Sequence, residues 1–218
     1  MTGPFFRVEI EPPPWLYHLM ARGPFFKRVY RLFLDDLTAG VPAGACLLDV
    51  GTGPGFLLDY LAPLRPDLRL FGLDLSRQML RRGQRRRSRL ALPLWPGVVA
   101  PAEVLPFGDA VFDQVLATFS FHIWRRPAQG VAEVSRVLKP GGRAWLYEIN
   151  REVAFPELRR FAAVEKIPYP LVYLGFRTIC WHHALRAGDF GRVFKEAGVK
   201  HWHLEPVHHL FWRGEIIA

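Results

Sequence analysis

The sequence has little cysteine and no long apolar run. Its two cysteines, Cys46 and Cys180, are too few for a disulfide framework, so we expect a reducing, cytoplasmic setting. Its apolar stretches stop well short of the ~20 residues that a membrane-spanning helix needs. The first residues lack the charged, apolar and cleavage regions of a secretory signal. No internal repeat or low-complexity linker interrupts the 218 residues, so we expect a single domain.

Acidic residues are scarcer than basic ones. Lysine and arginine number 29 against 20 aspartates and glutamates, which gives a net charge of +9 and a pI near 10.1. Such a surplus attracts nucleic acid, anionic lipid or acidic substrates, and composition alone does not choose among them. Half of the residues are hydrophobic and 14% are aromatic, which excludes a disordered chain and predicts a folded globular protein.

A glycine-dense turn follows the apolar run 46–50. Asp49 stands near the end of that run, and Gly51, Gly53 and Gly55 follow it at alternate positions. An apolar strand, an acidic residue and a glycine turn before a helix are typical of a nucleotide-type cofactor site. Phe56 occupies the place of the last glycine in the dinucleotide motif, and no G-K-[ST] follows, so neither the dinucleotide nor the P-loop interpretation holds.

Three further blocks follow in order. A second apolar run ends at Asp74, which lies 19 residues after Gly55, close to the roughly 20-residue offset of a strand–turn–helix–strand unit. Residues 102–107 precede an apolar run at 112–117, and the segment R-V-L-K-P-G-G-R at 136–143 leads into another at 144–149.

Together these blocks resemble the class I S-adenosylmethionine (SAM) dependent methyltransferases, closely over about residues 44–150 and loosely from 186 onward. The nearest likeness is the UbiE-like branch, also called methyltransferase type 11, which methylates small molecules such as quinone precursors. The resemblance implies a Rossmann-like three-layer α/β sandwich with a mostly parallel seven-stranded sheet and a reversed last strand. It also implies SAM as the cofactor and S-adenosyl-L-homocysteine as the product.

Alternating strand and helix patterns agree with that fold. Strands are predicted near 46–50, 69–73, 96–99, 112–117, 143–149, 199–205 and 208–217, and helices near 15–40, 55–63, 76–88, 127–138 and 187–197. We divide the chain into N-terminal lid helices (1–43), a SAM-binding core (44–149), a lid insertion (150–186) and a C-terminal helix with strands (187–218). The insertion is rich in aromatics and proline, which favours an apolar or aromatic substrate or simply the core of a lid.

The resemblance assigns a cofactor-binding set. It consists of Asp49, Gly51, Thr52, Gly53, Gly55, Asp74, Leu75, Met79, Ala102, Glu103 and Thr118. Asp49 would orient the amino group, the loop backbone would line the methionine end, and Asp74 would accept hydrogen bonds from the ribose hydroxyls. Pro101 stands where the family has an aspartate at the adenine edge, so Glu103 or only the backbone there would replace it. A structural turn and a helix cap at Asp74 are the alternatives.

Candidates for chemistry follow the fourth and fifth strands. His122 is either a general base near neutral pH or a residue that only shapes the pocket. The predicted substrate-binding set is Tyr17, His122, Glu148, Asn150 and Tyr173. The six histidines after position 180 form no compact metal motif such as H-E-x-x-H, so we expect no metal site.

An arginine run occupies positions 81–89. It is either a solvated helix face or a site for phosphate or anionic lipid. We expect methyl transfer from SAM to a small, apolar or aromatic molecule. One alternative is an RNA methyltransferase, which the high pI favours and the lack of an N-P-P-Y-type motif disfavours. The other alternative is a SAM-binding protein without catalysis.

Overall fold

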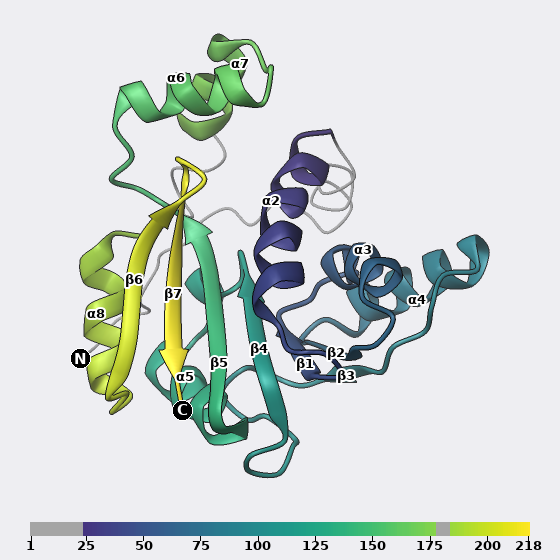
Figure 1. Ribbon diagram of the computed structural model, residues 1–218. Helices are drawn as coiled ribbons and strands as arrows, with labels where there is room; N and C mark the ends of the chain where they lie inside the picture. The colour runs from purple at the N-terminus through teal and green to yellow at the C-terminus, as the bar shows by residue number, and fades with distance from the viewer. Residues whose placement is uncertain (1–23, 178–183) are drawn as a thin grey trace.

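A seven-stranded sheet forms the centre of the molecule (Figure 1). The computed structural model describes residues 24–177 and 184–218, so Tyr17 and Cys180 lie outside the described residues. The strands are β1 (Cys46–Val50), β2 (Arg69–Asp74), β3 (Gly97–Val99), β4 (Phe112–Thr118), β5 (Leu138–Ile149), β6 (His201–Val207) and β7 (Phe211–Ile217). Their order is β3-β2-β1-β4-β5-β7-β6, and β7 runs antiparallel to both of its neighbours. This order and the reversed strand confirm the expected fold class.

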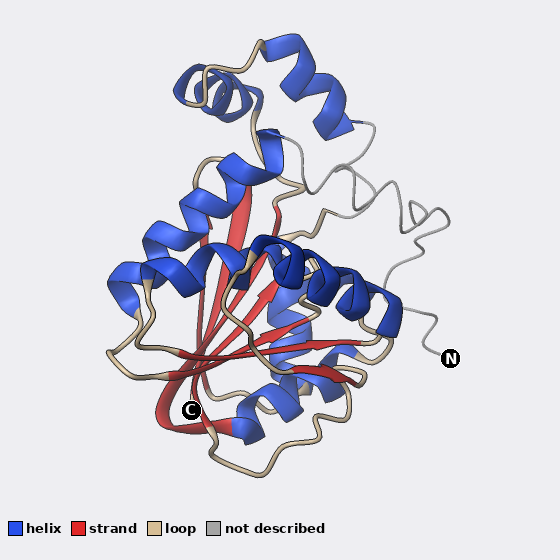
Figure 2. Ribbon diagram, turned by 90° about the vertical axis from the view of Figure 1, so that its right-hand side faces the viewer, coloured by secondary structure: helices blue, strands red, loops and turns tan. Residues whose placement is uncertain are grey.

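Helices cover both faces of the twisted sheet (Figure 2). They are α2 (Pro24–Gly40), α3 (Phe56–Leu64), α4 (Arg77–Leu90), the 3-10 turn η1 (Phe121–Ile123), α5 (Pro127–Val137), α6 (Phe155–Val164), α7 (Tyr169–Gly175) and α8 (Ala187–Glu196). One core cluster joins α2, α3 and α6 to strand residues such as Leu47, and the other joins α5 and α8 to residues such as Leu48. Neighbouring residues of β1 therefore serve opposite faces, which explains why this buried parallel strand is almost continuously apolar.

Two strand boundaries differ from the sequence expectation. β5 begins at Leu138 and not near 143, because Leu138 pairs with Phe112 before a register shift brings Arg143 opposite Gln114. The last turn falls at 208–210, two residues later than expected, because β6 continues to Val207. His208 and His209 in this turn adopt φ values of +49° and +66°, which side chains other than glycine rarely adopt.

The insertion after β5 folds into α6 and α7, which lie beyond the carboxyl end of β5 and next to the β6–β7 turn (Figure 1). His209 Nδ1 lies 2.6 Å from Glu157 Oε2 and joins that turn to α6. None of the helices that the structure describes is long and apolar enough to cross a membrane. The division of the chain into lid and core segments stays a prediction.

Candidate functional site

The glycine turn after β1 is packed too tightly from behind for other residues. The amides of Gly51 and Thr52 both donate to the Leu73 carbonyl, at 2.8 and 2.9 Å. Gly51 has a φ of +77°, and a Cβ there would lie 2.3 Å from Ser120 Cβ. Gly55 has a φ of +75°, and its Cβ would lie 2.0 Å from the Trp95 ring. The D-x-G-x-G-x-G pattern is thus a requirement of this turn, because both conformation and space exclude a side chain.

Asp74 ties the glycine turn to the start of α4. Its Oδ2 accepts a hydrogen bond from the Gly53 amide and its Oδ1 accepts one from the Ser76 amide, both at 2.7 Å. Burial raises the pKa of this carboxyl, although the two amide hydrogen bonds oppose the shift. Each carboxylate oxygen has a second lone pair, so these bonds leave capacity for ribose hydroxyls. The helix cap itself is the Ser76 hydroxyl, which accepts from the Met79 amide at 3.3 Å.

Asp49 is buried without full hydrogen bonding. Its side chain is 1% exposed, and burial, together with the nearby charge of Asp74, raises its pKa to about 7. Among the described residues, neither Asp49 Oδ1 nor Thr52 Oγ1 has a hydrogen-bond partner of good geometry, although Thr52 lies close enough to oppose the rise in the pKa of Asp49. Buried polar atoms of this kind destabilise a protein unless a ligand or water satisfies them. The pair therefore fits a ligand with a cationic donor, such as the α-ammonium group of SAM.

The residues expected around adenine separate into two groups. Leu75 is 62% exposed and Met79 half-buried, so both present apolar surface beside the turn. Glu103 is buried, and its Oε1 accepts from the Arg126 amide at 2.9 Å, at the N-terminus of α5. The hypothesis that the Glu103 carboxylate replaces the missing aspartate is therefore not supported, because this side chain caps a helix, where a negative charge is favourable. The backbone at Ala102 and Glu103 keeps its predicted role.

His122 and Glu148 form a buried pair at the ends of β4 and β5. His122 Nδ1 lies 2.9 Å from Glu148 Oε2, and the His122 amide donates to Glu148 Oε1 at 3.2 Å. Glu148 is fully buried in β5, whose register with β4 places Tyr147 opposite Thr118. A carboxylate that accepts from Nδ1 fixes both the orientation of the imidazole ring and its tautomer. Sequence analysis placed both residues in the predicted substrate-binding set, and the structure adds their direct contact.

The other predicted site residues are spread around this pair. Asn150 is buried, and its Oδ1 accepts from the Glu152 amide at 2.7 Å, so it shapes the exit of the chain from β5. Tyr173 lies on α7, with its ring centroid 5.9 Å from that of Phe155. Thr118 is buried at the end of β4. No three His, Cys, Asp or Glu side chains gather as metal ligands within 24–177 and 184–218.

Comparison with known proteins decides the family of this fold. Residues 48–146 match the methyltransferase domain family, over a span that holds the glycine turn, Asp74 and His122 and that ends within β5, two residues before Glu148. The core of this chain is a methyltransferase domain. The expectation of a class I methyltransferase of UbiE-like type is confirmed, and SAM is the cofactor of that class.

Two curated relatives of the methyltransferase domain are similar in sequence. The chain is 32% identical to the uncharacterized methyltransferase YdaC of Bacillus subtilis, over 54% of this chain and 64% of that protein. It is 33% identical to the ubiquinone/menaquinone biosynthesis C-methyltransferase UbiE of Geobacter sulfurreducens, over 57% of this chain and 50% of UbiE. The chain thus spans less than two thirds of either relative.

A solved structure agrees over nearly the whole chain. The crystal structure of a SAM-dependent methyltransferase from Aquifex aeolicus superposes with a TM-score of 0.72, over 95% of this chain and 99% of that one. The two sequences are 18% identical, so this likeness concerns the fold. It extends the fold agreement beyond the family match to the segments on either side of residues 48–146.

Sequence analysis missed a buried charge cluster behind the glycine turn of the methyltransferase domain. Asp59 of α3 accepts from Trp95 Nε1 at 3.0 Å and from Arg86 Nε at 3.1 Å. Arg86 also donates to the Pro54 carbonyl at 3.0 Å, and the Arg87 guanidinium lies 3.8 Å from the centroid of the Trp95 ring. Arg87 is almost fully buried, and this burial lowers its pKa. The interpretation of the arginine run as a wholly solvated face is therefore wrong for Arg86 and Arg87.

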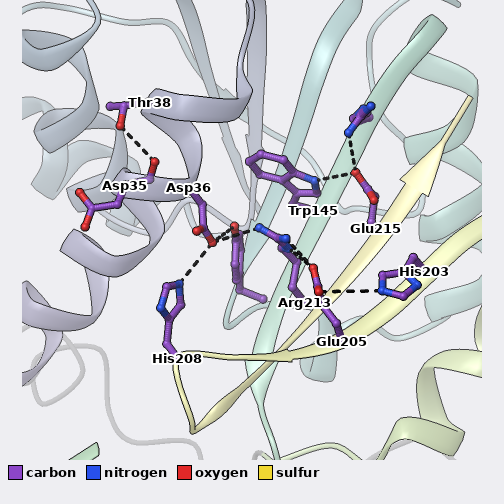
Figure 3. A network of polar contacts seen from close by, with 11 residues as sticks. Asp35, Asp36, Thr38, Trp145, His203, Glu205, His208, Arg213 and Glu215 are labelled. Atoms are coloured by element: carbon purple, nitrogen blue, oxygen red, sulfur yellow. Dashed lines mark hydrogen bonds and ion pairs between the residues drawn. The ribbon is translucent and has the colours of Figure 1, made fainter. Parts of the chain in front are cut away.

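A second missed network holds α2 on the sheet (Figure 3). Asp36 of α2 accepts from the Tyr147 hydroxyl at 2.8 Å, and His208 Nε2 lies 3.3 Å from the same carboxylate. Arg213 is paired with Asp36 at 3.2 Å and also with Glu205. The hydrogen bonds from His208 and Tyr147 outweigh burial and lower the pKa of Asp36. No sequence pattern points to this network, because its members come from α2, β5 and the β6–β7 hairpin, which are far apart in the sequence.

Proposed function

We propose that this chain is a SAM-dependent methyltransferase that acts on a small, apolar or aromatic molecule. The observation that carries the proposal is the buried Asp49–Thr52 pair with unsatisfied oxygens at the glycine turn of a methyltransferase domain. The relatives named as quinone C-methyltransferases support a quinone-like acceptor class. The exposed apolar side chains of α6 and α7 beyond the end of β5, such as Phe155, Val164 and Leu171, support the same class.

The chain's own residues would bind and orient the reactants. SAM, when bound, supplies a methyl group on a positively charged sulfur, which needs no further activation by the protein. Asp49 and the glycine turn would hold its amino acid end, and Asp74 would hold the ribose. The remaining task is to align the acceptor with the methyl group and to exclude water, which α2, α6 and α7 are positioned to do.

His122 is the proposed general base. Glu148 accepts from its Nδ1 side and would stabilise the imidazolium that forms when the ring takes a proton from an acceptor hydroxyl or acidic C–H. Both side chains are buried beside the carboxyl ends of β4 and β5, where ligands bind in open α/β sheets. Asn150 and Tyr173 are proposed to contact the acceptor from the same side.

The first test is transfer of radiolabel from methyl-labelled SAM into a fractionated lysate of the source cell. Label in the organic-extractable pool supports a lipophilic acceptor. Label in RNA overturns the small-molecule proposal. Confirmed SAM binding without label in any pool overturns the proposal in favour of a SAM-binding protein without catalysis.

Two variants separate cofactor binding from catalysis. Asp74→Ala should weaken SAM affinity at least tenfold in a folded protein, and unchanged affinity would remove the ribose assignment. His122→Ala should leave SAM affinity unchanged and lower turnover about 10²-fold or more. Glu148→Gln should lower turnover less than His122→Ala, because it disturbs the orientation of the base and leaves the base itself in place. An unchanged rate in His122→Ala would exclude the base role.

A further inference from the structure

The arginines of α4 divide into two groups. Its sequence RQMLRRGQRRRSRL contains no acidic residue. Arg82, Arg86 and Arg87 point inward and are half-buried or buried, and the last two belong to the cluster around Asp59. The exposed arginines recur every four residues and therefore form one line along the helix. They are Arg77, Arg81, Arg85 and Arg89.

This exposed line is uncompensated within the chain. None of its four guanidinium groups makes an ion pair or side-chain hydrogen bond with any residue that the structure describes. Like charges at i and i+4 repel one another and destabilise a helix. An anionic partner outside the chain would relieve that repulsion, whereas Arg86 and Arg87 already have Asp59 as their counter-charge.

Apolar side chains continue the same edge of the molecule. Leu94 is 77% exposed and Leu90 61%, and both follow the arginine line directly in sequence. An open groove of about 570 Å³ between α4 and β3 is lined by Arg77, Arg81 and Gln84 on one side and by Leu94 and Val99 on the other. Figure 1 shows α4 beside β3, with α8 at the opposite edge of the sheet. The edge therefore joins a line of exposed arginines to exposed apolar side chains.

We propose that this edge, formed by the exposed arginines of α4 and residues 90–99, docks the protein on the surface of an anionic phospholipid bilayer. The arginines would contact headgroup phosphates, and Leu90 and Leu94 would enter the boundary of the acyl chains. Clustered cations beside apolar side chains are the two components of peripheral membrane binding. Docking would bring the cofactor site close to a bilayer in which a lipophilic acceptor dissolves. Binding to the bilayer does not itself depend on methyl transfer.

The composition of the edge favours lipid over nucleic acid. Proteins that bind single-stranded nucleic acid stack bases on exposed aromatic rings. In the described part of this edge the one aromatic residue is Trp95, which is buried under Arg87. The large exposed side chains here are aliphatic, and these have no role in contacts to phosphate oxygens.

Vesicle co-sedimentation of the full chain tests this proposal. We expect binding to phosphatidylcholine vesicles that contain phosphatidylglycerol and at least tenfold weaker binding to phosphatidylcholine alone. The double variant Arg81→Glu/Arg85→Glu should lose at least tenfold in affinity for the anionic vesicles. Leu90→Ser/Leu94→Ser should keep binding at low salt and lose most of it at 0.3 M salt (a chosen test condition), because only the electrostatic part is screened.

The matched control is Lys195→Glu/Lys200→Glu, which changes the net charge equally at the opposite edge, on α8 and before β6. It should bind anionic vesicles within twofold of the wild type. Equal losses in the two charge variants, or no binding by the wild type, would overturn the proposal. So would preferential binding to a single-stranded RNA that displaces the vesicles. SAM affinity, measured on the same variants, should stay constant, so that failure of docking is distinguishable from failure of the cofactor site.

Discussion

Asp59 and Trp95 meet behind the glycine turn, where the indole Nε1 donates to the Asp59 carboxylate at 3.0 Å. The two residues are 36 positions apart in the sequence. The same indole ring lies against Gly55 and Gly72, at each of which a Cβ would overlap it. The Asp59–Trp95 contact therefore supports the conformation of the cofactor turn from the side opposite the ligand.

Asp59→Ala should destabilise the protein by about 3–5 kcal/mol, because it leaves the buried Arg87 and the half-buried Arg86 without their counter-charge. Urea unfolding measures the change in free energy. Asp35→Ala is the control, because Asp35 is an exposed acidic residue of α2, and its cost should stay within about 0.5 kcal/mol. Similar losses in both variants would show that the cluster does not stabilise the fold.

Gly55→Ala should cost more than Gly141→Ala, although both glycines have nearly the same φ, at +75° and +77°. The left-handed conformation alone costs an alanine about 1–2 kcal/mol at either position. A Cβ at Gly141 meets no atom within 4 Å, whereas one at Gly55 overlaps Trp95. Overlap in a packed core adds about 1–3 kcal/mol, which thermal unfolding of the two variants would reveal. Equal costs would mean that Trp95 moves aside freely.

Asp49→Asn should stabilise the protein without ligand at pH 8 and have little effect at pH 4. Asp49 titrates near pH 7 in the folded chain, whereas its pKa in the unfolded chain is about 3.9. The folded state therefore holds the extra proton between these values, and stability falls as the pH rises through that window. The full difference is on the order of 4 kcal/mol above pH 7, and asparagine removes it. Unfolding curves at both pH values test this, and a gain independent of pH would contradict the assignment.

Binding of SAM at pH 6 should release a proton from Asp49. At this pH the α-amino group of SAM is already charged, and its approach favours the ionised form of the carboxyl. Calorimetric titration in two buffers with different ionisation enthalpies measures the number of protons released. The release should approach one per SAM, and Asp49→Asn should abolish it. A release that persists in the variant would belong to another group.

The sequence predicted the elements that hold the cofactor turn well. β1 covers the expected residues 46–50, and α3 begins one residue after the expected position, because glycine spacing and apolar runs are local signals. The predicted start of β5 near residue 143 was wrong, since the observed start at Leu138 depends on pairing with Phe112 across a register shift. Pairing of this kind joins distant segments and leaves no periodicity in either.

The sequence predicted the contacts of polar side chains less well than it predicted the helices and strands. Either the Glu103 side chain or only the backbone at Ala102 and Glu103 was expected at the adenine edge, and the Glu103 carboxylate caps α5. The arginine run was interpreted as either a solvated helix face or an anion site, and Arg87 within it is buried between Asp59 and Trp95. Charged residues at helical spacing look alike in sequence whether they face water or a buried counter-charge, so the fold is needed to distinguish them.

The turn between β6 and β7 links two segments that the sequence separates by more than a hundred positions. His208 reaches Asp36 on α2, and His209 reaches Glu157 on α6. Both histidines have a left-handed backbone, so a change in the conformation of this two-residue turn would disturb both contacts. A substitution in this turn would therefore disturb the packing of α2 and of α6 at the same time, although neither helix is held by the turn alone.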